Sequence, residues 1–400
     1  QEEYCMSPAV QEALGRTNFA ALDWGIVVLY LAISVVIGLL VRRYVHNMAD
    51  YVSAGRKVGT ALGVATLTGT EMGLITVMYS SQLGFTNGFS AFHIALIHGA
   101  VTFLVGASGL IIYRLREARV ITIPEYYGRR YGRGVRVFGG IMLTLGGMLN
   151  MGLFLKAGAM FIVGVTGMDP AAVNIVMTVL LALVLVYTVL GGMVAVVITD
   201  YIQFVVMSVG LLIASLLCIK TLGWANIFDT VAATKGAAGF NPLIQEGGFG
   251  VGYMTWQGFL GLVGCALWPT AVARALAANS PKTVKKQFMW GSVSYTIRFL
   301  IPYFLGISAF VLIMSGAPDL KELFFPAARG AEPALESLYG MPVALGRLLP
   351  TGLLGIICAA MIAAFMSTHD SYLLCWSSVI TQDIVAPLRR GEMSTRGASC

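Results

Sequence analysis

Long apolar stretches dominate the chain, and each is close to the ~20 residues that an α-helix needs to cross a bilayer. Short polar segments rich in Gly, Pro, Lys and Arg separate them. The pattern predicts nine membrane-spanning helices, at 23–42, 58–78, 89–113, 137–164, 171–190, 194–219, 251–273, 288–314 and 349–379. We therefore expect an all-α polytopic membrane protein.

The same pattern predicts three parts of the chain. Residues 1–22 form an extracellular or periplasmic segment, residues 23–387 form the transmembrane domain, and residues 388–400 form a cytoplasmic tail. Two long loops, 221–250 and 315–348, are punctuated by Gly and Pro, which favours short surface helices or lids over a separate domain.

Composition agrees with a membrane protein, since 57% of the residues are hydrophobic, only 11% are charged and the mean hydropathy is +0.80. A soluble chain carries about 25% charged residues, so a soluble enzyme is excluded. The net charge of +7 could indicate a nucleic-acid partner, but we expect none, because the cytoplasmic loops of membrane proteins are rich in Lys and Arg.

The distribution of the basic residues predicts the orientation. With the amino terminus outside, 18 of the 26 Lys and Arg residues fall on the inner side and six on the outer side. Lys156 and Arg298 are the remaining two and lie within spans. The bias predicts an outside amino terminus and a cytoplasmic carboxyl terminus, in the plasma membrane or the inner membrane of a bacterium.

The second span contains polar residues at its centre. From Gly63 to Gly73 it reads GVATLTGTEMG, with three Gly, three Thr and Glu71. Small residues alone could serve close helix packing. An acid at membrane depth is costly and usually functional, and transporters often interrupt a helix there so that bare backbone groups bind ions.

The seventh span has a similar character. Gly258, Gly261 and Gly264 precede Trp268 and Pro269, and the proline predicts a kink or a break. The second and seventh spans are five apart, which is the arrangement of an inverted repeat of five helices each.

The ninth span carries hydroxyl groups within about one helical turn, at Ser367, Thr368 and Ser371. Ser367 and Ser371 share a helix face. Hydroxyl and carbonyl oxygens are hard ligands that suit a small cation such as sodium. Alternatively, these side chains donate back to carbonyls of their own helix.

Several separated motifs resemble the sodium/solute symporter family. They are 123–126 (IPEY), 190–203 (LGGMVAVVITDYIQ), 274–280 (RALAANS), 363–371 (AAFMSTHDS) and 381–384 (TQDI). The resemblance extends from about residue 23 to 387. It implies a leucine-transporter-type five-plus-five inverted repeat with one extra leading helix, and sodium coupled to solute by alternating access.

The resemblance also implies sites. The coupling ion, Na⁺, is expected at the backbone carbonyls of Ala65 and Thr68 and at Ala364, Ser367 and Thr368. Asp200 matches an acid that the family places on the sodium exit route. The alternative for Asp200 is a charge that only complements a helix dipole.

The substrate is inferred from differences within the family. Arg298 matches a sugar-contacting Lys of the sugar transporters, but Met72 replaces their sugar-binding Gln and Gly264 their stacking Tyr. The Pro269 to Arg274 spacing is instead similar to the proline, acetate and pantothenate branches, although Thr270 replaces their usual His.

Charges at membrane depth agree with a carboxylate substrate. Lys156 and Arg298 against Glu71 predict a net positive midplane, unless these side chains pair with each other or snorkel away. The expected substrate contacts are Glu71, Met72, Gly261, Gly264, Trp268, Arg298 and Lys156.

We therefore expect sodium-coupled symport of a small organic solute, with a carboxylate or amino acid favoured over a sugar. The alternative is a solute-sensing, symporter-like membrane module of a signalling protein; no enzymatic motif is present. The first repeat falls at about 58–219 and a partial second repeat at about 251–386. The second repeat is predicted to be truncated after the eighth core helix, so a fragment, a shortened gene product or a completing partner is expected. The oligomeric state is open.

Overall fold

The computed structural model describes residues 8–41, 56–245, 248–326 and 332–389. These residues form helices and connecting turns, apart from an isolated β-bridge between Val58 and Ala278. The predicted all-helical class is confirmed. The loop 42–55, the first residues of the amino-terminal segment and nearly all of the predicted tail 388–400 lie outside the described residues.

In chain order the helices are α1 (Pro8–Gly15), α2 (Ala21–Val41), α4 (Thr60–Glu71), α5 (Leu74–Asn87), η3 (Gly88–Ala91), α6 (Phe92–Ser108), α7 (Ile112–Glu117), α8 (Ile123–Tyr131), α9 (Arg133–Thr166), η4 (Pro170–Ala172), α10 (Val173–Leu222), α11 (Trp224–Lys235), η5 (Gly236–Gly239), α12 (Val251–Leu267), α13 (Pro269–Ala277), α14 (Pro281–Gly316), α15 (Pro318–Phe324), η6 (Ser337–Tyr339), α16 (Gly340–Leu348), α17 (Leu353–Val379), the π-helical η7 (Ile380–Val385) and α18 (Ala386–Leu388).

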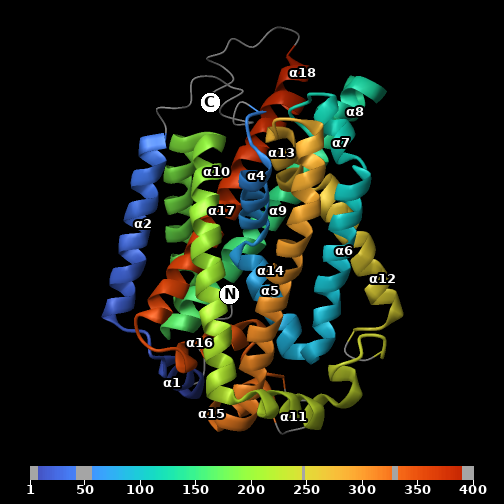
Figure 1. Ribbon diagram of the computed structural model, residues 1–400. Helices are drawn as coiled ribbons and strands as arrows, with labels where there is room; N and C mark the ends of the chain where they lie inside the picture. Colours follow the sequence, from blue (N-terminus) through green and yellow to red (C-terminus); the bar gives the residue numbers. More distant parts are fainter. Residues whose placement is uncertain (1–7, 42–55, 246–247, 327–331, 390–400) are drawn as a thin grey trace.

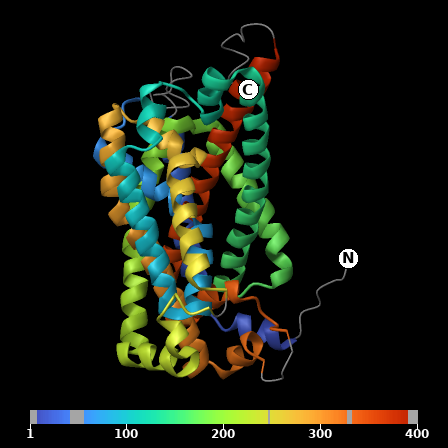
Figure 2. The same ribbon diagram turned by 90° about the vertical axis from the view of Figure 1, so that its right-hand side faces the viewer.

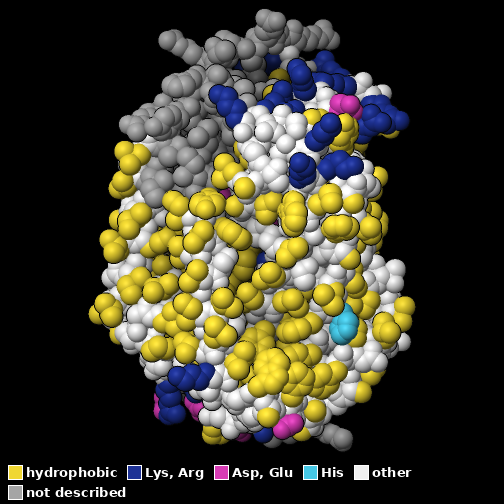
Figure 3. All heavy atoms as spheres, viewed as in Figure 1, with side chains coloured by type: hydrophobic (Ala, Val, Ile, Leu, Met, Phe, Trp, Pro, Cys, Tyr) yellow, Lys and Arg dark blue, Asp and Glu magenta, His cyan; other side chains and the backbone are white. Residues whose placement is uncertain are grey.

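The long helices run side by side as a bundle with two distinct ends (Figures 1 and 2). The upper end, as drawn, carries α7, α8 and α18, and the lower end carries α1, α11 and α15. Hydrophobic side chains cover the middle of the visible face, and many Lys and Arg side chains gather at the upper end (Figure 3). This apolar band between polar ends is the surface expected of a membrane protein.

Within the described residues, five helical stretches are long and apolar enough to cross a membrane, or six if the bent pair α12 and α13 counts as one. They are Leu74–Ser108, Arg133–Thr166, Asp200–Leu222, Pro281–Gly316 and Leu353–Leu388. Shorter apolar helices cover Ala21–Ser34 and Pro170–Leu185. The predicted second span is too irregular to belong to this group, because it divides into α4 and the start of α5.

α10 covers both predicted spans between residues 171 and 219. Just before α10, Asp169 accepts a hydrogen bond from Gln11 of α1 at 2.8 Å, so this helix begins at the lower end. It also finishes there, where α11 follows (Figure 1). The chain therefore crosses the bundle twice within α10, as the two predicted spans require.

Two acids, the buried Asp23 and the ion-paired Asp319, join the elements of the lower end. The Asp23 carboxylate of α2 accepts hydrogen bonds from the backbone N–H groups of Gly352 at 2.7 Å and Gly355 at 2.6 Å, at the start of α17. Arg347 of α16 donates to both carboxylate oxygens of Asp319, at 3.0 and 2.7 Å. Hydrogen bonding from Arg347 holds the pKa of Asp319 below its ordinary value. These contacts fix the lower end around the site helices.

Candidate functional site

The second span is broken where the sequence predicted an interruption. α4 ends at Glu71, Met72 leaves helical geometry with φ −91° and ψ 55°, and Gly73 is extended before α5 begins. A Cβ on Gly73 would lie 2.2 Å from the Thr368 hydroxyl of α17. The break therefore packs directly against the hydroxyl-bearing part of the ninth span, and only glycine permits this approach.

The seventh span is broken as well. α12 ends at Leu267, Trp268 is extended with φ −74° and ψ 127°, and Pro269 opens α13. The two helices meet at a bend of 43°. Proline begins a helix well but cannot continue one, since it has no N–H to donate. The predicted break at Trp268 and Pro269 is confirmed.

Asp200 of α10 lies at the centre of a buried polar cluster. Its Oδ2 accepts hydrogen bonds from the hydroxyls of Thr66 at 2.7 Å and Thr70 at 2.8 Å, both on α4. Its Oδ1 accepts from the Ser367 hydroxyl of α17 at 2.7 Å. One carboxylate thus joins three helices that are far apart in the sequence.

Arg274 of α13 completes this group, which we call the Asp200–Arg274 cluster: Thr66, Thr70, Asp200, Arg274, Ser367 and Ser371. The Arg274 Nη2 lies 3.0 Å from Asp200 Oδ2 and donates to the Ser371 hydroxyl at 2.6 Å. The Arg274 and Asp200 side chains are 1% and 0% exposed. The cluster therefore contains a fully buried ion pair that ties the second half of the broken α12–α13 span to α10 and α17.

The three expected sodium ligands on α17 are all buried. The Thr368 hydroxyl donates to the Ala364 carbonyl at 3.0 Å and lies 3.4 Å from the Thr70 carbonyl of α4. Ser367 instead points to Asp200. Back-donation to the helix, the alternative considered for these hydroxyls, therefore occurs at Thr368 alongside its contact with α4, and at Ser371, whose hydroxyl donates to the Ser367 carbonyl at 2.8 Å.

The two expected ligands on α4, Ala65 and Thr68, are buried too. The Thr68 carbonyl accepts the backbone N–H of Met72 at 2.8 Å, which closes the last turn before the break. The Thr68 hydroxyl lies 2.6 Å from the Ser294 hydroxyl of α14. The structure thus brings the α4 and α17 segments together through the Gly73 and Thr70 contacts.

A second charged group, the Glu71–Arg298 pair, lies between α4, α13 and α14. Glu71 Oε1 accepts a hydrogen bond from the Thr270 hydroxyl at 2.8 Å, and Glu71 Oε2 lies 3.8 Å from Arg298 Nη1. The Arg298 guanidinium sits 3.6 Å from the ring centre of Tyr295 and 4.6 Å from that of Phe299. Aromatic faces favour a cation at such distances.

The remaining expected substrate contacts differ in their surroundings. Met72 is buried at the first break, and Trp268 lies at the second, where its ring meets that of Trp376 edge to face. A Cβ on Gly261 would lie 3.2 Å from His98, whereas a Cβ on Gly264 would have no neighbour within 4 Å. Both glycines belong to α12, directly before the second break.

Lys156 does not join these residues. Its side chain is exposed on α9, whereas Arg298 is buried, and the expected contribution of Lys156 to a positive midplane stays a prediction. A long lysine side chain can reach the membrane interface along the helix, which was the alternative reading of this residue.

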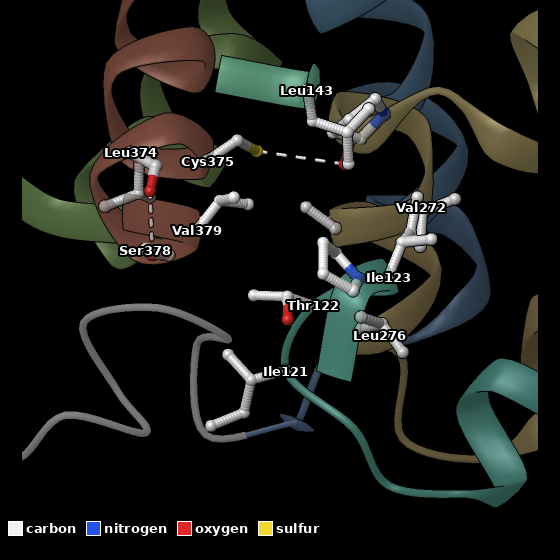
Figure 4. A pocket seen from close by; sticks show the side chains of 13 residues that line it. Ile121, Thr122, Ile123, Leu143, Val272, Leu276, Leu374, Cys375, Ser378 and Val379 are labelled. Atoms are coloured by element: carbon white, nitrogen blue, oxygen red, sulfur yellow. Dashed lines mark hydrogen bonds between the residues drawn. The ribbon is translucent and has the colours of Figure 1, made fainter. Parts of the chain in front are cut away.

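A small open pocket lies between α8, α13 and α17 (Figure 4). Its lining includes Thr122 before α8, Leu143 of α9, Pro269 at the second break, and Cys375 and Ser378 of α17. The pocket thus lies beside Pro269, the residue that opens α13, and close to α8 at the upper end.

The sequence model of the sodium:solute symporter family matches residues 51–398 of the chain. The chain belongs to the sodium:solute symporter family. The resemblance inferred from the motifs is confirmed, and with it sodium-coupled solute symport, sodium as the coupling ion and a transporter rather than an enzyme.

Individual relatives are named for different solutes. The chain is similar to a sodium/glucose cotransporter of Vibrio parahaemolyticus, at 25% identity over 91% of this chain and 68% of the relative. It resembles the high-affinity proline transporter PutP of Bacillus subtilis, at 26% identity over 90% and 73%. Its match to sodium/glucose cotransporter 4 of Danio rerio is 24% identical and spans 97% of this chain but 61% of that relative.

A solved structure has the same fold. The substrate-bound, outward-open state of a Na⁺-coupled sialic acid symporter superposes with a TM-score of 0.82 at 20% identity, over 95% of this chain and 78% of that chain. The predicted fold class is confirmed. The expected truncation of the second repeat stays a prediction.

Proposed function

We propose that the chain binds sodium where the broken α4–α5 span meets α17, and binds a small amino acid or carboxylate beside the two breaks. Alternating access would then couple the two. The observation that carries the sodium site is the packing of Gly73 against Thr368, which brings the end of α4 to the hydroxyls of α17. The proposed ligands are the carbonyls of Ala65, Thr68 and Ala364 and the hydroxyls of Ser367 and Thr368.

Asp200 is proposed as the next stop for sodium on its way out. Its carboxylate already accepts a hydrogen bond from the Ser367 hydroxyl. A sodium ion released from Ser367 would therefore be next to the negative charge of Asp200. In this structure Arg274 neutralises that charge. Sodium passage past Asp200 would therefore compete with Arg274, which links ion release to the position of α13.

The proposed solute contacts are Glu71, Met72, Gly261, Gly264, Trp268 and Arg298. Met72 offers no hydrogen-bonding amide and Gly264 offers no stacking ring, which disfavours a sugar. A buried cation such as Arg298 favours a carboxylate. Relatives described as proline transporters agree with this preference.

Removing the two α17 hydroxyls tests the sodium site. The Ser367→Ala and Thr368→Ala double variant is expected to lose at least tenfold of sodium-dependent uptake in proteoliposomes, because two sodium ligands disappear. The matched control is Ser377→Ala, on the same helix, whose exposed hydroxyl donates to the Leu374 carbonyl. Uptake that is independent of sodium and unaffected by the Ser367 and Thr368 changes would refute the proposal.

We further propose that the protein lies in the plasma membrane with its upper end in the cytoplasm. The orientation is inferred from the Lys and Arg residues at the upper end, because cytoplasmic loops are rich in these residues. In a variant without native cysteines, Lys321→Cys on α15 is expected to react with a membrane-impermeant maleimide on intact cells. Arg133→Cys, at the start of α9, should react only after permeabilisation. The reverse labelling pattern would invert the orientation.

A further inference from the structure

We propose that three arginines at the upper end, Arg56, Arg116 and Arg119, bind a phosphate group, with the headgroup of an anionic phospholipid as its source. We call these residues the arginine cluster. The cluster shares no residue with the proposed sodium and solute sites, so its test is independent of theirs.

Backbone carbonyls hold the three side chains near one another. Arg116 of α7 donates from Nε to the Ala278 carbonyl at 2.7 Å, and Arg56 donates from Nη2 to the Arg119 carbonyl at 2.8 Å. The backbone N–H of Arg119 in turn donates to the Arg116 carbonyl at 3.2 Å. These hydrogen bonds position the cluster but leave its three positive charges unneutralised.

Carboxylates do not neutralise the cluster either. Within the described part of the chain, none of its three arginines forms an ion pair. The acids of α7 and α8 are engaged elsewhere, since Glu117 pairs with Arg114 and Glu125 with Arg129. Arg116 is only 7% exposed, and a nearly buried cation without a counter-ion is costly. An anion is therefore favoured beside it.

The fold holds these like charges together at a cost. Burial, and then the charges of Arg56 and Arg119, lower the pKa of Arg116 below its ordinary value. Arg56 and Arg119 also have left-handed backbones, with φ of 56° and 53°, which residues other than glycine adopt rarely and with strain. An anion between the three guanidinium groups would relieve their mutual repulsion.

Two of the three side chains are open to a ligand. Arg119 is exposed, and its guanidinium makes no hydrogen bond with the described residues. Arg56 is half-buried and donates only from Nη2. The N–H groups of arginine match the oxygens of a phosphate in pairs, and basic pockets beside the cytoplasmic ends of membrane helices bind lipid headgroups. A phosphate group therefore fits the cluster.

The apolar surface of α6 favours a lipid as the source of this phosphate. Leu96, Phe103 and Leu104 of α6 are exposed, and so is Leu110, which lies between α6 and α7. Figure 1 shows α7 at the upper end of α6. In a membrane such side chains contact acyl chains, so a lipid that lies along α6 has its headgroup at the level of α7. Free phosphate would use the charges alone.

The cluster also touches the junction between the two broken spans. Ala278, whose carbonyl accepts the Arg116 hydrogen bond, forms the β-bridge with Val58. In this bridge the Val58 N–H donates to the Ala277 carbonyl at 3.2 Å. The bridge joins the start of α4 to the end of α13. A bound lipid that neutralises the cluster is therefore expected to stabilise this junction.

The test measures thermal unfolding of the purified full chain in detergent at constant ionic strength. The probes are phosphatidylglycerol, phosphatidylcholine and inorganic phosphate. We expect phosphatidylglycerol to raise the unfolding temperature saturably, because a bound ligand stabilises the folded state, and phosphatidylcholine to leave it unchanged. A rise with inorganic phosphate that equals the rise with phosphatidylglycerol would overturn the lipid as the source.

Variants locate the site. Arg56→Gln with Arg119→Gln is expected to weaken the apparent affinity for phosphatidylglycerol by about tenfold or more, because each basic residue near the membrane surface adds to the attraction. Arg116 is kept, since it is nearly buried. Arg56→Lys with Arg119→Lys retains both charges and should stay within about threefold of the unchanged chain, although lysine lacks the paired N–H groups. A folding defect alone would not follow the charge in this way.

The matched control is Lys282→Gln with Lys286→Gln at the start of α14, where both side chains are exposed. It removes the same charge from the same end of the molecule and should leave the affinity unchanged. Equal weakening by the arginine and lysine pairs would show a general attraction to a basic surface and overturn the site. An unfolding temperature that does not respond to phosphatidylglycerol would overturn it as well. Neither result bears on sodium-dependent uptake, so the proposed function is tested separately.

Discussion

Arg274→Met is expected to destabilise the protein by about 3–5 kcal/mol, because it leaves the buried Asp200 carboxylate without its cation. The guanidinium touches both Asp200 and Ser371, and neither side chain of the ion pair reaches solvent. Protein stabilities are often only about 5–15 kcal/mol, so a loss of this size should lower the yield as well as the unfolding temperature. Thermal unfolding of the detergent-extracted protein measures both.

A neutral double variant separates the charge from the packing. Asp200→Asn combined with Arg274→Met is expected to be less destabilised than the two single changes together, because it leaves no unpaired buried charge. Arg114→Ala is the exposed control, at an ion pair 2.9 Å long whose side chains are 75% and 51% exposed, and should change little. If the Arg274→Met protein is as stable as the Arg114→Ala control, burial of the Asp200 carboxylate does not require Arg274 as its partner.

The helix breaks could be predicted because their causes are local. Three glycines, three threonines and an acid in an apolar run mark the first break, and Trp268 before Pro269 marks the second. Each cause acts on the backbone of its own segment. Hydrophobic pattern and proline chemistry therefore suffice to place both breaks.

The partners of the polar residues could not be predicted in the same way. Asp200 and Arg274 are 74 positions apart, and Asp200 and Ser367 are 167 apart. Each lies in a segment whose local pattern gives no sign of the other. Thr66 and Thr70 also join the cluster, and their position one turn apart on α4 was the available signal that both face one neighbour.

Lys156 and Arg298 show that the hydropathy pattern could not predict which cation within a span is buried. Both are single cations within apolar spans, but one is exposed and the other 6% exposed. A helix that is apolar all around gives no face preference from which to read burial. Tyr295, three residues before Arg298, was the usable clue, because residues at that spacing are neighbours on a helix and the ring covers the guanidinium.

Gly306→Ala is expected to have the second largest effect. A Cβ at this position of α14 would lie 1.8 Å from the backbone oxygen of Ser81 on α5. The approach is reciprocal, since a Cβ on Gly84 of α5 would lie 2.1 Å from the backbone oxygen of Tyr303 on α14. Backbone atoms cannot rotate away as side chains can, so the two helices must separate.

That separation should reduce both stability and solute binding. Overpacking of this kind commonly costs about 1–3 kcal/mol, and α14 carries Arg298 while α5 starts at the first break. The matched control is Gly152→Ala on α9, where a Cβ would meet nothing within 4 Å and alanine improves helix propensity. Equal unfolding temperatures for the two variants would mean that α5 and α14 do not touch through their backbones. A lower temperature for Gly306→Ala alone, with weaker solute binding, would tie this close contact to the geometry of the site.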